Sequence, residues 1–283
     1  MPFLDFLLDK NPVKRIGPPN LANVTRISFE GLLGRLQGKD PNYNPKIPDF
    51  LQHFIEAKET HPDLVNEGVI MGYLLVNLLA GADTTAITIR AIFYYTLRNP
   101  DIYKKLEQEI LSADLGDDIA KYSVARSLPY LEAVVREGMR MHPGVCMILE
   151  RYVPEQGLTL PDGSFVPPGC GVGINPYVVN RNNQIWGDDA DTYRPERWLQ
   201  RDGEDEEAYR ERMRLWNATD LTFGGGSRIC IGRNFATLEI YKIVPTLIKN
   251  YEIEIADPTA EWEVTGCWFP RQKGLICNIK KRD

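Results

Sequence analysis

Hydrophobic residues recur at helical spacing along the first half of the chain, while short apolar runs separated by turns follow later. The helical spacing is clearest where Phe50, Leu51, Phe54 and Ile55 fall on one face. Proline marks the ends: Asn99-Pro100 stops a long apolar segment, and prolines begin the next two helices. The pattern predicts helices over residues 47–60, 66–98, 100–113 and 129–142. Residues 11–44, rich in Pro, Gly and Asn, predict a loop with short helical pieces.

After Pro143 the pattern becomes typical of short strands. The predicted strands lie at residues 147–153, 158–160, 164–166, 172–175, 251–256 and 275–279. Pro161-Asp162-Gly163 is a hairpin signal between two of them. Residues 201–214 are charged and poor in apolar side chains, which predicts a solvated surface loop or helix. Helices first and small sheets later predict an α+β fold that is mainly α.

Composition narrows the class of protein. The net charge is −6 with both signs interspersed, which argues against nucleic acid as a partner. Five cysteines without a CxxC pair or a secretory signal indicate a reduced, intracellular protein, and three scattered histidines argue against a histidine metal site. The apolar N-terminus is short and interrupted by acids, and the longest apolar run, Val69 to Ala82, is too short to span a bilayer. We expect that run to be a buried helix.

The segment from Phe223 to Gly232 carries the strongest chemical signal. Its glycines predict a tight loop, Arg228 precedes Cys230 closely, and an apolar helical pattern then runs to about Asn250. A thiol at the start of a helix meets backbone N–H groups and the positive helix end, which favours a thiolate. A lone cysteine is more often a small buried hydrophobe, and three glycines alone would mark only a flexible loop. The whole pattern favours a ligand cysteine.

This segment resembles the haem-binding signature of the cytochrome P450 family. The resemblance rests on Phe223, Gly226, Arg228, Cys230 and Gly232. It implies that Cys230 is the axial thiolate ligand of haem b iron and that Arg228 pairs with a haem propionate. Phe223 would lie against the thiolate side of the haem.

A second motif lies within the long predicted helix, in Ala80-Gly81-Ala82-Asp83-Thr84-Thr85. Taken alone, it is explained well by close helix packing, with threonine hydroxyls bonded one turn back. It also resembles the oxygen-activation motif of the same family. That resemblance implies that Ala80 and Gly81 leave room for dioxygen over the haem. Thr84 would hold a water and Asp83 would help relay protons from solvent.

Two further segments resemble the scaffold of the family. Glu137 and Arg140 share a helical face, a pair that on its own would be a minor surface contact. With Arg197 of Pro195-Glu-Arg-Trp198 they resemble the buried network that fixes the cysteine loop. Arg151 resembles a second propionate anchor, and residues 144–148 and 267–269 fall where the family contacts substrate.

The motifs occur in family order over nearly the whole chain. We therefore expect residues 1–283 to form one cytochrome P450 domain, the C-terminal portion of the fold with its long central helix, cysteine loop and small sheets. The N-terminal half of the fold would be absent, so the haem cleft would lack part of its wall. Residues 2–5 and 8–12 resemble fungal members of the pisatin demethylase-like group.

The function implied by the resemblance is that of a haem-thiolate monooxygenase. It would insert one oxygen atom from O2 into a small apolar or aromatic substrate, with electrons from NADPH-cytochrome P450 reductase. A haem-thiolate isomerase or dehydratase is an alternative, although such proteins commonly lose the acid–threonine pair, here Asp83-Thr84. A non-catalytic remnant with weak or no haem binding is another. A full-length relative would associate with the endoplasmic reticulum membrane, but no anchor is evident in these residues.

Overall fold

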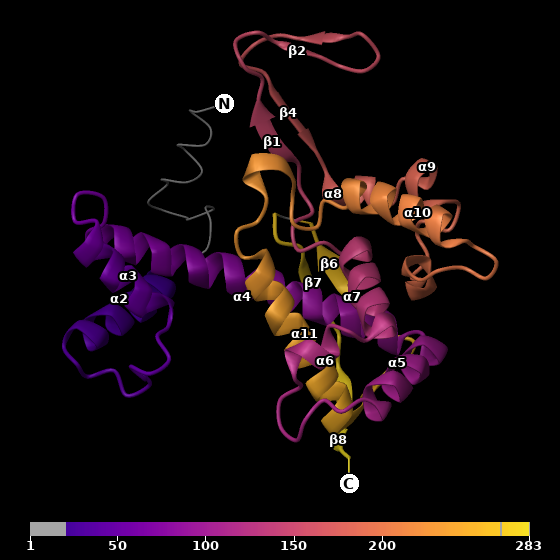
Figure 1. The fold of residues 1–283 in the computed structure, drawn as a ribbon, viewed down its shortest axis with the longest axis horizontal. Helices are drawn as coiled ribbons and strands as arrows, with labels where there is room; N and C mark the ends of the chain where they lie inside the picture. The colour runs from indigo at the N-terminus through magenta and orange to yellow at the C-terminus, as the bar shows by residue number, and fades with distance from the viewer. Residues whose placement is uncertain (1–20, 267, 283) are drawn as a thin grey trace. The chain divides into compact units, whose positions relative to one another are not determined.

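The computed structural model describes residues 21–266 and 268–282 and confirms a mainly helical α+β fold (Figure 1). The helices are α2 Ala22–Leu36, α3 Phe50–Thr60, α4 Glu67–Leu97, α5 Pro100–Ser112, α6 Tyr122–Ala125, α7 Pro129–Met141, α8 Pro176–Val179, α9 Asn183–Trp186, α10 Glu206–Thr219 and α11 Arg233–Asn250, with 3-10 turns η1 Pro195–Trp198 and η2 Gly226–Arg228. The chain divides into two compact units, residues 1–82 and 83–283, and α4 begins in the first and ends in the second.

In the first unit, α2 is a regular helix where the sequence predicted a loop with short helical pieces. The prediction was wrong because Gly31 and Gly34 interrupt the apolar periodicity without ending the helix. Leu32, Val65 and Ile70 form the buried centre of this unit. Arg35 fastens the segment after α2, since its guanidinium donates to the carboxylates of Asp40 and Asp49.

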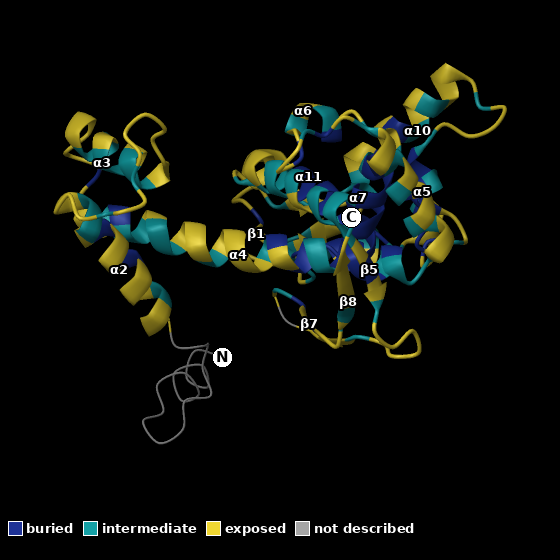
Figure 2. Ribbon diagram, turned by 90° about the horizontal axis from the view of Figure 1, so that it is seen from below, coloured by how far each residue is buried: buried dark blue, intermediate teal, exposed yellow. Residues whose placement is uncertain are grey.

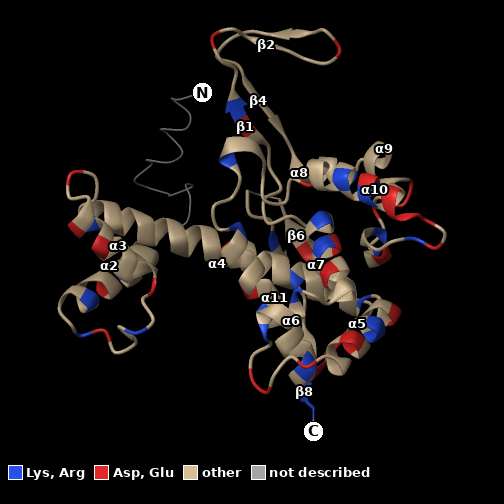
Figure 3. Cartoon of the chain, in the orientation of Figure 1, with Lys and Arg blue, Asp and Glu red and all other residues tan. Residues whose placement is uncertain are grey.

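The apolar run from Val69 to Ala82 lies on α4, but it is not the buried helix that the sequence predicted. Tyr73, Val76 and Leu78 are all exposed, and only 17% of the most apolar window of α4 is buried. Figure 2 shows the corresponding exposed stretch of α4, and Figure 3 shows by its colours how few charged residues this helix contains. An apolar side chain is buried only where another part of the protein packs against it. By length and composition alone α4 could cross a membrane, a criterion that core helices of soluble proteins also meet.

The core of the second unit is a helical layer completed by one strand. The C-terminal half of α4 meets α5, α7 and α11, and the strand β5 Tyr251–Ile255 follows α11 directly. The fully buried members include Ile92, Leu106, Leu131 and Val244. Apolar residues spaced three and four apart put Leu106 and Leu131 on the inner faces of α5 and α7, two helices that the sequence predicted.

All the described sheets are antiparallel pairs of strands. The strands are β1 Leu149–Tyr152, β2 Leu158–Thr159, β3 Phe165–Val166, β4 Gly171–Ile174, β5, β6 Glu263–Thr265, β7 Arg271–Lys273 and β8 Cys277–Lys281, paired β1–β4, β2–β3, β5–β8 and β6–β7. Between β2 and β3 the predicted turn is present: Gly163 has φ +87°, which a residue with a Cβ rarely adopts. The N–H of Leu160 donates to the carbonyl of Ser164 at 2.8 Å.

Candidate haem-thiolate site

The cysteine loop folds back on itself and closes with a backbone hydrogen bond. The N–H of Cys230 donates to the carbonyl of Phe223 at 2.8 Å. Two turns make this closure feasible, because Gly224 and Gly226 have φ of +71° and +62°. Gly232 then precedes the 18-residue helix α11 without a capping side chain, and a Cβ built on it would lie 3.8 Å from Sγ of Cys230, so the thiol lies beside the residue at the start of this helix. The loop and its helix are as the sequence predicted.

The chemistry of this loop fits a haem group. Cys230, Arg228 and Ile231 are exposed, so a thiol donor, a cation for an acidic group and an apolar side chain are all accessible. A Cβ built on Gly226 would meet no atom within 4 Å, which leaves open space at that turn. Phe223 is half-buried at the base of the loop, with the Arg233 guanidinium 5.8 Å from its ring centroid. A thiolate, a cation and apolar contacts are what a haem with two propionates requires.

The strand β1 approaches the loop, which places Arg151 near it. A Cβ built on Gly224 would lie 3.9 Å from Cδ1 of Leu149, the first residue of β1. Side chains two apart on a strand share a face, so Arg151 lies on the same face of β1 as Leu149. Its guanidinium is exposed and donates to the carbonyl of Glu150 at 2.7 Å. These contacts are compatible with the predicted role of Arg151 as a second anchor.

A buried network of acid and arginines lies in the same unit, as the sequence predicted. The carboxylate of Glu137 on α7 accepts from Nε and Nη2 of Arg140 at 2.9 and 2.8 Å and from Nε of Arg197 at 3.3 Å. All three side chains are at most 1% exposed. The indole of Trp198 and the backbone N–H of Arg194 also donate to this carboxylate, at 2.9 and 3.0 Å. Glu137 therefore ties α7 to the segment around η1.

The arginines of the network bind backbone carbonyls with their remaining N–H groups. Arg140 donates to the carbonyls of Asn180 and Ala190, both at 2.6 Å. Arg197 donates to the carbonyl of Trp186 at 2.7 Å and to the carboxylate of Asp189 at 3.0 Å. A minor surface pair, the alternative for Glu137 and Arg140, is therefore excluded. Because each buried arginine has partners, the desolvation cost of the network is offset.

The acid and threonine of the second motif lie on α4 at the start of the second unit. Asp83 is exposed, whereas Thr84 is half-buried. A Cβ built on Gly144 would come within 3.3 Å of the Thr84 Cβ, so Gly144 lets its segment pass directly over Thr84. The back-bonding expected from helix packing also occurs, since the Thr88 hydroxyl donates to the Thr84 carbonyl at 2.9 Å. Ala80 and Gly81 belong to the first unit and are exposed on α4.

The two predicted substrate segments are joined by a hydrogen bond. The N–H of Cys146 donates to the carbonyl of Trp268 at 3.3 Å. Cys267 lies outside the described residues, as do the N-terminal residues 2–5 and 8–12 that resemble the pisatin demethylase-like group. Met147, Ile148 and Trp268 are exposed, so these segments offer apolar side chains to a ligand.

The residues that fasten the β6–β7 hairpin to α4 were not predicted from the sequence. The buried amide of Gln272 donates to the Ile87 carbonyl at 3.1 Å, and Arg90 donates to the Gln272 carbonyl at 2.6 Å. Trp262 stacks on Tyr94 with ring centroids 3.9 Å apart. No short-range pattern signals contacts between residues so far apart in the chain. These contacts connect the hairpin that carries Trp268 to the helix that carries Thr84.

The fold, the cysteine loop and the buried network are the features that the sequence predicted from its resemblance to the cytochrome P450 family. The cytochrome P450 family model matches residues 32–277, and the chain belongs to this family. Membership implies a haem-thiolate cofactor in general. The family model spans residues of both compact units, and the prediction of a single domain stays a prediction.

Three fungal relatives illustrate the similarity. The chain is 52% identical to the cytochrome P450 monooxygenase cfoH of Aspergillus candidus, over 100% of this chain and 52% of the relative. It is 38% identical to cicH of Emericella nidulans, over 100% of this chain and 56% of the relative. It is 35% identical to vrtE of Penicillium aethiopicum, over 97% of this chain and 54% of the relative. The chain thus spans about half the length of the curated relatives it matches.

A buried histidine lies beside the Thr84 region, at the start of the His142-Pro143-Gly144 segment. Its ring is 5.0 Å from the ring of Trp262, and its Nε2 has no hydrogen-bond partner among the described residues. Burial, together with the nearby charges of Arg181 and Arg90, lowers the pKa of His142 from 6.5 to about 4. The folded state therefore keeps His142 neutral.

We predict that the free energy of unfolding falls as the pH is lowered from about 6.5 to about 4. Over this range the unfolded chain takes up a proton that folded His142 does not, a contribution of about 3 kcal/mol. The replacement His142→Phe removes the titratable imidazole, so the free energy of unfolding should depend less on pH over this range. Denaturant unfolding of both proteins at a series of pH values measures the difference. Identical slopes in the two proteins would contradict the assignment.

Proposed function

We propose that the protein is a haem-thiolate monooxygenase that inserts one oxygen atom from O2 into an organic substrate. The observation that carries this proposal is the exposed thiol of Cys230, which is presented by a closed loop at the start of α11. Family membership and the similarity to fungal monooxygenases support it. Bound haem would supply the activation of O2, for which a thiolate ligand favours O–O cleavage.

The chain's own residues would bind and orient the haem. Cys230 would bind the haem iron as a thiolate, which the positive end of α11 favours. The guanidinium groups of Arg228 and Arg151 would pair with the two propionates, because charge-assisted hydrogen bonds from arginine suit carboxylates. Phe223 would cover the sulfur side and exclude water from it. The turn at Gly226 would let the backbone approach closely.

Proton delivery would depend on α4. The Asp83 carboxyl group, exposed to solvent, would take up a proton and pass it inward, and the Thr84 hydroxyl would hold the water that receives it. Ala80 and Gly81 would leave room for dioxygen. Gly144 supports this role of Thr84, because any side chain at that position would press on the threonine.

The substrate class would be small apolar or aromatic molecules. The exposed side chains of Met147, Ile148 and Trp268, in segments joined by the Cys146–Trp268 hydrogen bond, provide apolar contacts. Two electrons would come from NADPH through an NADPH-cytochrome P450 reductase. We expect an intracellular protein, with association to the endoplasmic reticulum membrane in a full-length relative.

The carbon monoxide difference spectrum of the chain, supplied with haem and reduced with dithionite, tests the proposal. We expect a red-shifted Soret band typical of thiolate ligation, which Cys230→Ser abolishes because a serine hydroxyl does not replace the thiolate. Cys170→Ser is the matched control, since Cys170 is also exposed but lies outside the loop, and it should leave the band unchanged. A band that survives Cys230→Ser, or a wild-type spectrum without it, would contradict the proposal.

The role of Thr84 is tested by the yield of product per oxygen consumed. Thr84→Ala should lower this yield by roughly tenfold, because a positioned proton donor contributes at least this much to the rate of proton transfer. Thr88→Ala is the control, since it removes a hydroxyl one turn further along α4 that donates to the Thr84 carbonyl. Oxygen uptake and product formation are measured together with a reductase. An unchanged yield in Thr84→Ala would remove Thr84 from the mechanism.

A further inference from the structure

The charged stretch at residues 201–214, expected to be a solvated surface segment, has an inner face that is buried. Its residues 206–214 form the first part of α10, which begins after its N-cap Asp205. Met213 and Trp216 are buried, and the side chain of Arg212 is only 12% exposed although arginine is among the most polar residues. A buried arginine needs partners, and these show what α10 contacts.

Side chains of α10 donate to three consecutive backbone carbonyls, those of residues 197–199, and the first two of these residues belong to the buried network. Nη1 of Arg212 donates to the carbonyl of Arg197 at 2.7 Å, and Nη2 donates to that of Leu199 at 2.9 Å. The hydroxyl of Tyr209 donates to the carbonyl between them, that of Trp198, at 3.1 Å. The position of α10 is therefore fixed directly by the backbone of Arg197, whose side chain binds Glu137.

A second partner holds Arg212 in the orientation that these bonds require. Its Nε and Nη2 donate to the two carboxylate oxygens of Glu204, at 2.7 and 2.5 Å. Glu204 is itself 11% exposed and accepts from the backbone N–H of Arg201 at 3.0 Å. The fork of the guanidinium thus uses its donors on one carboxylate and two carbonyls, a geometry that lysine cannot reproduce.

The far end of α10 leads into the cysteine loop. Trp216 packs against Trp186 and Trp198 and donates from its indole to the Ile185 carbonyl at 3.1 Å. The helix ends at Thr219, and Asp220 accepts from the N–H of Thr222 at 2.9 Å. The next residue, Phe223, provides the carbonyl that receives the N–H of Cys230. Few residues therefore separate the anchored helix from the closing bond of the loop.

We propose that Arg212 and Glu204 are a positioning pair that sets the cysteine loop by fixing α10 to the backbone at residues 197–199. The pair acts through Trp216 and the turn at Asp220, and both residues lie outside the cysteine loop. The consequence for thiolate ligation rests on the proposed function, whereas the consequence for the loop does not.

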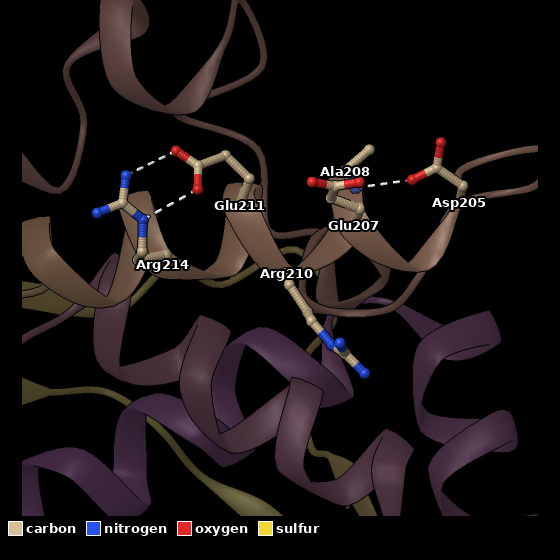
Figure 4. A pocket seen from close by; sticks show the side chains of 6 residues that line it. All are labelled: Asp205, Glu207, Ala208, Arg210, Glu211 and Arg214. Atoms are coloured by element: carbon tan, nitrogen blue, oxygen red, sulfur yellow. Dashed lines mark hydrogen bonds and ion pairs between the residues drawn. The ribbon is translucent and has the colours of Figure 1, made fainter.

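The same helix offers a matched control. Arg214 and Glu211 form an equally bidentate pair at 2.9 and 2.7 Å, but their side chains are 79% and 65% exposed (Figure 4). They line an open, charged hollow on α10 together with Asp205, Glu207, Ala208 and Arg210. Arg214→Met therefore removes the same kind of pair from the same helix without touching the carbonyls at 197–199.

Hydrogen–deuterium exchange of the full chain, measured without added haem, tests the proposal. In Arg212→Met the amide of Cys230 should exchange on the order of tenfold faster than in wild type, because charge-assisted bonds that order the loop are lost. Amides of the core helices α7 and α11 should keep their rates. Arg214→Met should match wild type throughout. If the pair only stabilised the fold as a whole, Arg212→Met would accelerate amide exchange in the loop and in the core helices by the same factor, and this result would overturn the proposal. Equal exchange rates of the Cys230 amide in Arg212→Met and Arg214→Met would also overturn it.

The carbon monoxide spectrum of the haem-loaded variants provides the second readout. Arg212→Met should have a several-fold lower ratio of thiolate-type to non-thiolate bands than Arg214→Met. If the wild type lacks the thiolate band, the proposed function fails, while the exchange comparison still decides whether the pair positions the loop. If Arg212→Met does not fold, Glu204→Gln against Glu211→Gln tests the pair from the acidic side. Faster Cys230 exchange in Glu204→Gln alone supports the proposal, and equal rates overturn it.

Discussion

The Glu137 carboxylate is the interaction on which the second unit depends. It is completely buried, so its charge is stable only because cationic and neutral donors surround it. Those donors come from α7 itself and from the segment 194–198, which contains the short turn η1 and no strand. The donors to this carboxylate are the side chains of Arg140, Arg197 and Trp198 and the backbone N–H of Arg194.

From this carboxylate a continuous set of contacts leads to the thiol. Arg197 binds Glu137 with its side chain and α10 with its carbonyl, and α10 carries the chain to the loop that Cys230 closes. The loop itself buries little apolar surface, since Cys230 and its neighbours are exposed. Its order therefore comes from hydrogen bonds and from the helices at its two ends, α10 and α11. A rigid support with an exposed donor suits a site that must bind a large planar group.

Much of this arrangement could be predicted from the sequence, because its signals are local. Proline and glycine marked the ends of α5 and α7 and the turns of the loop, and the spacing of Glu137 and Arg140 placed them on one helical face. Other features depend on contacts distant in the chain. The spacing of charges in α10 does not indicate that Arg212 turns inward to carbonyls at 197 and 199. Likewise, the local pattern around Val76 on α4 does not show that this side chain is exposed, because burial depends on whether another part of the protein packs against it.

Glu137 is thus expected to support the whole second unit together with the cysteine loop. Denaturant unfolding of Glu137→Gln tests this role most directly, with Glu132→Gln as the control on the same helix, where Glu132 pairs with Arg126 at a partly exposed position. We predict a loss of about 3–5 kcal/mol in the free energy of unfolding for Glu137→Gln, because buried arginines lose their counter-charge. The control should lose at most about 1 kcal/mol. Equal losses in the two variants would contradict the central role of Glu137.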